Sequence, residues 1–167
     1  MRAVAVLMVL LVVGCQHDPN TTAYTTAQPK TNDLAGTHVP TTKTLSQIAK
    51  EGHYPTASPS IVLTSDGTIV ITDIPDWWVS FGESRGAFDS GRGSWGVVKH
   101  QEWWALGVVF RNTEHLASVQ SRFAKLGSSP GDYGAVMMLV GEKAPYKIHL
   151  ILGDPDEGRS MQFERSP

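Results

Sequence analysis

A serine, an aspartate and a histidine come closest to a catalytic set in this sequence. Ser84 stands in Gly-Glu-Ser-Arg-Gly at positions 82–86, which satisfies G-x-S-x-G, and Asp132 and His149 follow in the order nucleophile, carboxylate, base. This arrangement catalyses acyl transfer when the serine sits on a sharp turn between a strand and a helix, above a sheet. The residues after Gly86 read AFDSGRGSWG, which will not form a helix. Hydrolysis at Ser84 is therefore the alternative hypothesis and not the first interpretation.

An acidic turn and six histidines are the possible metal ligands. Asp154, Asp156 and Glu157 place three carboxylates within four residues, but an EF-hand spreads its calcium ligands over about twelve residues between two helices. The histidines show neither HxH nor HExxH spacing, and there is only one cysteine. We therefore expect no metal site, no cofactor and no catalytic residue. We expect His149 to lie on a solvated strand face beside Lys147.

Two adjacent pairs of tryptophans are the strongest candidates for a binding surface. Neighbouring side chains on a strand point to opposite faces, so one ring of each pair lies away from the core unless a helix or loop covers it. An exposed tryptophan beside a groove is typical of a surface that binds a sugar, a lipid or a protein. The sequence favours packing in the core and leaves binding as the competing hypothesis. The residues concerned are Trp77, Trp78, Trp103 and Trp104.

Cys15 is the only cysteine of the 167 residues, and it follows an apolar segment. Arg2 precedes eleven apolar residues, Ala3 to Val13. A membrane-spanning helix needs about 20, whereas eleven suit the middle of a secretory signal. The segment ends Val-Val-Gly-Cys, which resembles the lipobox of bacterial lipoproteins. The resemblance implies that residues 1–14 are a signal peptide, and that Cys15 becomes the first mature residue and carries diacylglycerol and a further fatty acid such as palmitate.

This anchor predicts a location in the cell envelope, with the membrane as a partner through the lipid on Cys15. Two or three acyl chains hold a protein essentially permanently, because each buried methylene contributes about 0.8 kcal/mol. Gln16 is not the aspartate that in enteric bacteria resembles an inner-membrane retention signal, so we expect the outer membrane if the organism is Gram-negative. The chain has 14 Lys and Arg against 16 Asp and Glu without a basic run, which excludes nucleic acid as an expected partner.

Two regions of different composition follow the signal. The first, 15–33, contains the lipidated cysteine and then five threonines, two prolines and a single large apolar residue, Tyr24, which predicts a flexible tether. The second, 34–165, has the length of a single domain. Because Cys15 is the only cysteine, this domain must be stable without disulfides.

Period-2 alternation predicts that the domain is mainly β. The clearest hairpin runs from Ser60 to Asp73, with a three-residue loop that ends in Gly67 in the left-handed conformation. That register pairs Leu63 with Ile69, and Ile61 with Ile71, so the four largest side chains share one face. The further expected strands are a hairpin in 93–110 whose register the pattern does not decide, a hairpin in 146–165, and single strands at 34–39 and 135–140.

Two segments are predicted helices, an amphipathic one over about 113–126 and a short one over about 44–51 with Leu45 and Ile48 inward. About eight strands in mostly adjacent antiparallel pairs favour an antiparallel meander. A lipocalin-like barrel is the first expectation, because closure removes exposed sheet edges. A two-layer sheet with the longer helix across one face is the second.

Several motifs of the domain together resemble those of a group of uncharacterised bacterial proteins. The shared order is DGT at 66–68, PDWW at 75–78, GxGxW at 91–95 and GDPD at 153–156. The resemblance spans nearly the whole domain but implies no activity, so it assigns no functional residue.

The combined expectation is a non-catalytic envelope module that binds a protein, a glycan or an amphiphile, and an inhibitor or immunity protein is one particular form of it. The expected site is a barrel mouth edged by Trp77 or Trp78 and a glycine-rich loop at 82–93. The alternative is a small hydrolase that uses Ser84.

Overall fold

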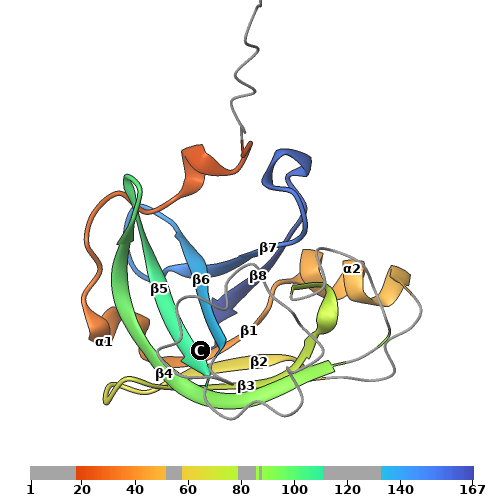
Figure 1. The fold of residues 1–167 in the computed structure, drawn as a ribbon, viewed down its shortest axis with the longest axis horizontal. Coiled ribbons are helices and arrows are strands. Elements are labelled where there is room, and N and C mark those ends of the chain that lie inside the picture. Colours follow the sequence, from red (N-terminus) through yellow and green to blue (C-terminus); the bar gives the residue numbers. More distant parts are fainter. Residues whose placement is uncertain (1–17, 52–57, 79–85, 87, 111–132) are drawn as a thin grey trace, which may run out of the picture.

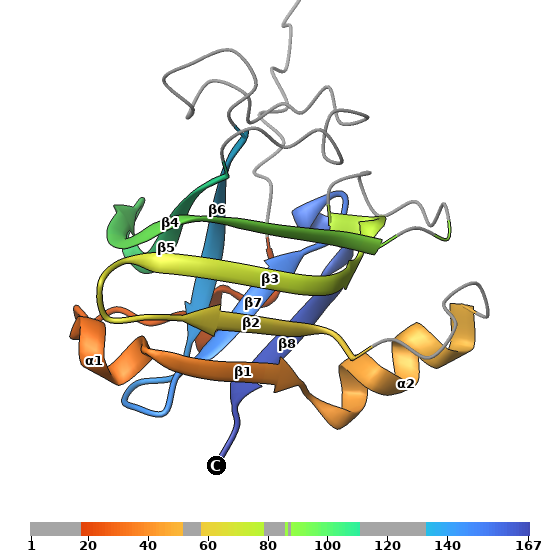
Figure 2. The same ribbon diagram turned by 90° about the horizontal axis from the view of Figure 1, so that it is seen from below.

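The computed structural model describes residues 18–51, 58–78, 86, 88–110 and 133–167. Eight antiparallel strands close into a barrel in which each strand pairs with its neighbours in sequence and the last pairs with the first (Figures 1 and 2). The barrel expected from the sequence is confirmed, and the two-layer sheet is wrong. The strands are β1 Gly36–Pro40, β2 Ser60–Leu63, β3 Thr68–Pro75, β4 Phe88–His100, β5 Trp103–Phe110, β6 Tyr133–Val140, β7 Lys147–Ile151 and β8 Ser160–Arg165.

Within the described residues, five short helical elements lie around this barrel: η1 Thr21–Ala23, α1 Thr31–Leu34, α2 Thr42–Glu51, η2 Asp76–Trp78 and η3 Pro155–Glu157. Helix α2 confirms the short helix expected at about 44–51. The amphipathic helix expected at about 113–126 lies outside the described residues.

One side chain of α2 points differently from the expectation. Ile48 is buried as expected, but Leu45 is 47% exposed. The hydroxyl of Thr44 donates to the carbonyl of Gln162 (3.1 Å) and accepts from its N–H (2.9 Å). These bonds turn the face that carries Thr44 and Ile48, four residues apart, toward the barrel, and Leu45 is left outside.

The hairpin registers follow the apolar pattern where that pattern is strong. Leu63 pairs with Ile69 and Ile61 with Ile71, as expected, and Gly67 has a φ of 85°. The β7–β8 hairpin was also predicted, and its inward residues pair as Ile148 with Phe163 and Leu150 with Met161.

The described part of the interior is a packed core, as an eight-stranded barrel just wide enough for side chains allows. Its fully buried members include Ile61, Leu63, Ile69, Ile71, Leu106, Phe110, Met137, Leu139, Ile148, Leu150, Met161 and Phe163.

The segment before the barrel differs from the expected flexible tether from Asp18 onward. Strands β5 and β6 separate beyond the pair Ala105 and Met138, and the chain around Thr25 fills the fork. The Thr25 N–H donates to the Leu139 carbonyl (2.9 Å), and the Trp104 N–H donates to the Thr25 carbonyl (2.8 Å). Composition did not reveal this docking, because it depends on backbone groups that the two diverging strands leave unpaired.

Candidate binding surface on the outer wall

Tyr24 anchors the N-terminal segment on the outside of the barrel. Its side chain is 6% exposed and makes edge-to-face contacts with the rings of Trp103 (centroids 5.5 Å apart) and His149 (5.4 Å). Its hydroxyl donates to the Asp18 carboxylate, and burial, together with that carboxylate, raises the pKa of Tyr24. Together with Ala105 and Met138 it forms a second apolar cluster outside the main core.

His149 is buried beneath this segment, so the expectation of a solvated strand face is wrong. The strand alternation does point it outward, but Tyr24 covers it and none of its surface is exposed. Its Nδ1 accepts a hydrogen bond from the Gln162 side-chain amide (3.1 Å), and its Nε2 has no partner in the described part of the chain. Burial lowers the pKa of His149 to about 4, although the charge of Asp18 opposes the shift. The imidazole is therefore neutral near pH 7.

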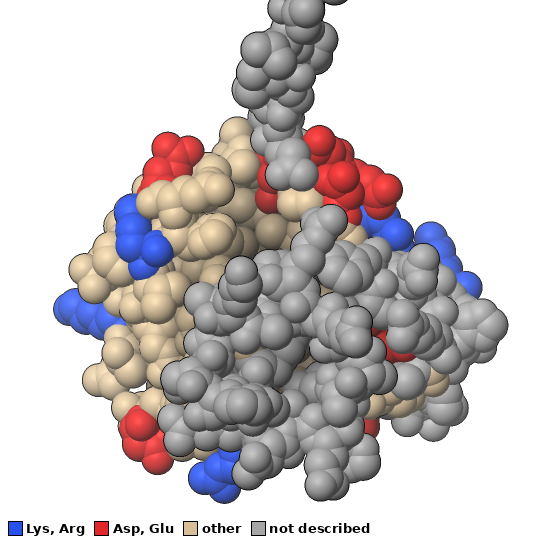
Figure 3. All heavy atoms as spheres, in the orientation of Figure 1, with Lys and Arg blue, Asp and Glu red and all other residues tan. Residues whose placement is uncertain are grey.

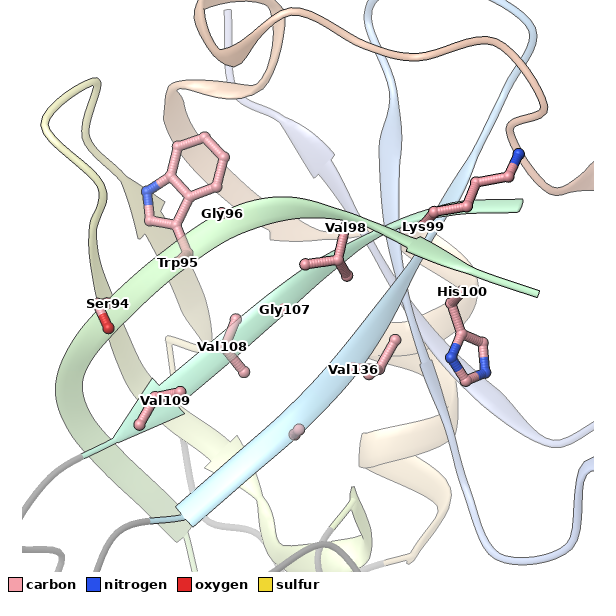
Figure 4. Close-up of a pocket in the computed structure, with 11 residues that line it drawn as sticks. Ser94, Trp95, Gly96, Val98, Lys99, His100, Gly107, Val108, Val109 and Val136 are labelled. Atoms are coloured by element: carbon pink, nitrogen blue, oxygen red, sulfur yellow. The ribbon is translucent and has the colours of Figure 1, made fainter. Parts of the chain in front are cut away.

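A groove beside this cluster is formed where side chains are missing from the wall. Gly96 of β4 and Gly107 of β5 lie opposite each other in the register. Their position leaves a hollow of about 470 Å³ on the outer face (Figure 4). A Cβ atom at Gly96 would meet nothing within 4 Å, whereas one at Gly107 would lie 2.8 Å from Cγ1 of Val98. We call this hollow the outer groove and define it by Ser94, Gly96, Val98, Gly107, Val109 and Val136.

The outer groove is lined mainly by aliphatic side chains, and its polar lining residues are Ser94, Lys99 and His100. Val98, Val109 and Val136 are half-buried, and the two glycines add no polar side chain. Lys99, at one end, donates to the Glu102 carbonyl (2.6 Å) and lies 5.1 Å from the centroid of a Trp104 ring. Such a floor offers mainly apolar area, worth about 25 cal/mol per Å² removed from water.

The outer groove and the Tyr24 cluster are parts of one apolar strip. Val98 and Val136 line the groove and also pack against the cluster of Tyr24, Ala105 and Met138. The N-terminal segment therefore covers one half of the strip, and the described residues leave the valines of the other half partly exposed.

The four tryptophans do not form one surface. Trp77 is fully buried in η2, and Trp78 is half-buried with its ring edge-to-face on Phe110 (6.4 Å, 79°). Trp103 and Trp104 begin β5 and are half-buried. Because β3 and β5 run in the same direction, the pair after β3 and the pair at the start of β5 lie at opposite ends of the barrel. Trp77 therefore cannot edge the barrel mouth that was expected as the binding site, because its side chain is buried in the core.

Two buried carboxylates lie at the end of the barrel where β3 finishes. Asp76 and Asp89 are each at least nine-tenths buried, and Oδ2 of Asp89 has no partner in the described part of the chain. Burial raises the pKa of Asp89 to about 6, and the Asp76 charge adds to the shift.

The expected loop at 82–93 is wrong from residue 88 onward. Phe88 to Gly93 form the start of β4 and pair with β3, with Asp89 opposite Ile74. Ser84 and Asp132 lie outside the described residues, as does Cys15.

The sequence analysis did not predict the outer groove, because the groove forms only in the β4–β5 register that places two glycines opposite each other. Isolated glycines within valine-rich strands suggest a bulge or a close approach, and Gly96 and Gly107 are of this kind. The sequence did not decide the pairing of β4 with β5, so nothing placed the two glycines opposite each other.

The described residues contain no group of three or more His, Cys, Asp or Glu side chains that could hold a metal ion. Within the same residues, no helix has the length and apolar character needed to cross a membrane. Comparisons with family models, with curated proteins and with solved structures find no match to this chain.

Proposed function

We propose that this chain is a lipid-anchored, non-catalytic binding module of the bacterial cell envelope. Lipid on Cys15 holds it on a membrane, the outer membrane where the organism has one, and the outer groove takes the ligand. The lipobox-like sequence supports the anchor. The single observation that carries the binding role is the aliphatic hollow at Gly96 and Gly107, on a barrel whose described interior is filled by its own side chains.

The chemistry of the groove favours an apolar ligand. Valines and glycines can bury the apolar side chains of a protein partner or the chain of an amphiphile. A glycan is less well served, because sugar recognition uses exposed aromatic faces, and Trp95, the nearest indole, is only 7% exposed and donates from Nε1 to the Thr64 carbonyl (3.1 Å).

Photo-crosslinking in intact cells tests the binding role. A photoreactive amino acid at Val109, in the groove, is expected to give a discrete adduct that disappears when Gly96→Leu fills the hollow. Thr37, an exposed outward residue of β1, is the matched position and is expected to give no such adduct. Equal adducts from Val109 and Thr37, or an adduct unaffected by Gly96→Leu, would overturn the assignment of the groove.

Mass analysis of the N-terminal peptide tests the anchor separately. The peptide is expected to begin at Cys15 and to carry the mass of two or three acyl chains. Cys15→Ser is expected to leave the chain unprocessed or released from the membrane. An unmodified Cys15 in a processed chain would refute the lipid anchor.

The described residues give no support to the hydrolase alternative. Tyr24 covers His149, and Gln162 occupies its Nδ1, so the base that Ser84 would need is sealed away. A fluorophosphonate probe is expected not to label the protein. Labelling that is lost in Ser84→Ala would reinstate hydrolysis.

A further inference from the structure

We infer that the barrel lies directly against the headgroups of a zwitterionic lipid surface, with the docked N-terminal segment and the turns beside it facing the membrane. This inference rests on the proposed lipidation of Cys15. It goes further because it assigns an orientation and a second contact surface to the domain.

The chain is held on the barrel from Asp18 onward. The Asp18 carboxylate accepts from the backbone N–H of Asn20 (2.8 Å) and from the hydroxyl of the buried Tyr24. Pro19 lies against the β7–β8 connection, since a Cβ atom at Gly158 would be 2.7 Å from its Cγ. The free part of the tether therefore ends at Asp18, well before Leu34.

The chain between Cys15 and Asp18 is short. Only Gln16 and His17 lie between Cys15 and Asp18, and the three Cα–Cα steps across them reach at most about 11 Å at full extension. The headgroup layer of one leaflet is itself about 5–7 Å thick. A lipidated Cys15 would thus hold Asp18 within or just above the headgroups. A free coil over all of 16–33 would instead allow roughly 23 Å.

The surface that meets the lipid lies around Asp18. Asp18 and Thr21 share a small hollow with His100 and Gln101 of the β4–β5 tip, with Trp103, and with Pro155 of η3. We call these six residues the exit rim. In Figure 1 the β4–β5 tip and the β7–β8 connection flank the place where the chain leaves the barrel. The half-buried indole of Trp103 suits the boundary between headgroups and water.

The charge near the exit rim decides which lipid surface fits. Figure 3 shows acidic side chains gathered along the edge of the barrel at which the described chain begins. The exposed carboxylates of the two flanking turns outnumber their cations. The acidic residues are Glu102, Asp154, Asp156 and Glu157, and the basic ones are Lys99 and Arg159. An anionic bilayer would repel such a surface at close range, so the anchor and not charge attraction brings it to the lipid, and a zwitterionic surface is the better match.

The experiment uses the lipidated protein purified from the envelope and reconstituted into phosphatidylethanolamine and phosphatidylcholine vesicles. Lipidation consumes the Cys15 thiol, so an introduced cysteine is the only free one. A fluorophore is attached to His100→Cys in the exit rim or to Ser65→Cys in the β2–β3 turn. Both native residues are exposed, and that turn lies at the other end of the barrel from the first described residues, drawn in red (Figures 1 and 2). Vesicles with nitroxide-labelled headgroups then report proximity by quenching.

The label at position 100 is expected to lose most of its emission, and the label at position 65 little. Twenty Gly and Ser residues inserted between His17 and Asp18 should bring the first label down to the quenching of the second. Including anionic phosphatidylglycerol at low salt should weaken the quenching at position 100. Equal quenching at both positions, or no effect of the insertion, would overturn the inference. The N-terminal mass separates the two failures, because lipidated protein without selective quenching refutes only the orientation.

Discussion

His149 on the outer wall and Asp89 at the end of the barrel are both withdrawn from water, yet burial moves their pKa values in opposite directions. The pKa of His149 falls to about 4 and that of Asp89 rises to about 6, because desolvation disfavours the charged form of each. The outer site, Tyr24 with His149, is created when a segment docks onto a finished wall. The end site consists of Trp77 of η2, which directly follows β3 and packs in the main core, and of Asp89 of β4. The difference suggests that damage to the outer site stays local and that damage to the end site is global.

The largest expected effect comes from the end site. Trp77→Ala removes a fully buried indole from the main core and should lower the free energy of unfolding by about 3–5 kcal/mol. Denaturant unfolding followed by far-ultraviolet circular dichroism measures this change as a loss of the whole sheet.

The matching change at the outer site, Tyr24→Ala, should mainly release the segment. Hydrogen exchange should speed up at the Thr25 and Trp104 amides, which bond across the fork, and much less at core amides of β2 and β3. If Tyr24→Ala instead accelerated exchange throughout the sheet, the outer site would be part of the global fold and the comparison would fail.

The next largest effect is the contribution of His149 to the pH dependence of the free energy of unfolding. Its pKa is 6.5 in the unfolded chain and about 4 in the folded one, so the unfolded state binds more protons between these values. Stability from this group therefore falls as the pH drops from 6.5 to 4, by about 3 kcal/mol in all. Buried His38, whose pKa burial also lowers, acts in the same sense.

His149→Gln removes this contribution, so the stability of the variant relative to the wild type should be about 3 kcal/mol higher at pH 4 than at pH 7, as measured by urea unfolding at both. If the difference between variant and wild type were the same at the two pH values, His149 would not be the group that titrates.

Asp89 should make the folding stability depend on pH in the opposite direction. Its pKa is 3.8 unfolded and about 6 folded, so the folded state binds more protons and stability falls as the pH rises from about 4 to 6. Asp89→Asn removes the buried charge and should stabilise the protein by about 1–3 kcal/mol at pH 7, reduced by any unpaired amide hydrogen. The variant should also expose the uncompensated His149 slope. A destabilised variant at pH 7 would show that the carboxylate is needed in its ionised form.

The sequence predicted well wherever one face of a strand carries the large apolar residues. In β2 and β3 a slip by one residue would bury Thr64 and Thr68, so the pattern selects a single register. In β4 and β5 valines and glycines occupy both faces, because the outer face is itself apolar under Tyr24 and in the outer groove. No alternation distinguishes inside from outside there, and the pairing of Gly96 with Gly107 could not be derived.

The outer site was hidden for a related reason. Tyr24 is a single apolar residue within a polar stretch, and a composition argument assigns such a stretch to solvent. Its docking depends on a fork between β5 and β6, which exists only once these two strands have paired. His149 was then misassigned, because strand alternation correctly pointed it outward but could not show what covers it.

The smallest expected effect on stability comes from backbone strain at two residues with a positive φ, one near each site. Gln101, in the β4–β5 tip of the exit rim, has a φ of 54°, and Asp73, in the bulge of β3 that leads to the end site, has a φ of 49°. The left-handed region costs most residues about 1–2 kcal/mol, but aspartate tolerates it better. The Asp73 N–H also donates to Ser90 Oγ (2.9 Å), which holds the bulge in place.

Gln101→Gly should therefore stabilise the protein by about 0.5–1 kcal/mol after the extra entropy of glycine in the unfolded chain is subtracted. Asp73→Gly should change stability by less. Urea unfolding of both variants under the same conditions measures the difference. A larger gain at Asp73 would mean that the bulge, and not the exposed tip, stores the strain, and that the strands leading to the end site are less rigid than the docked outer wall.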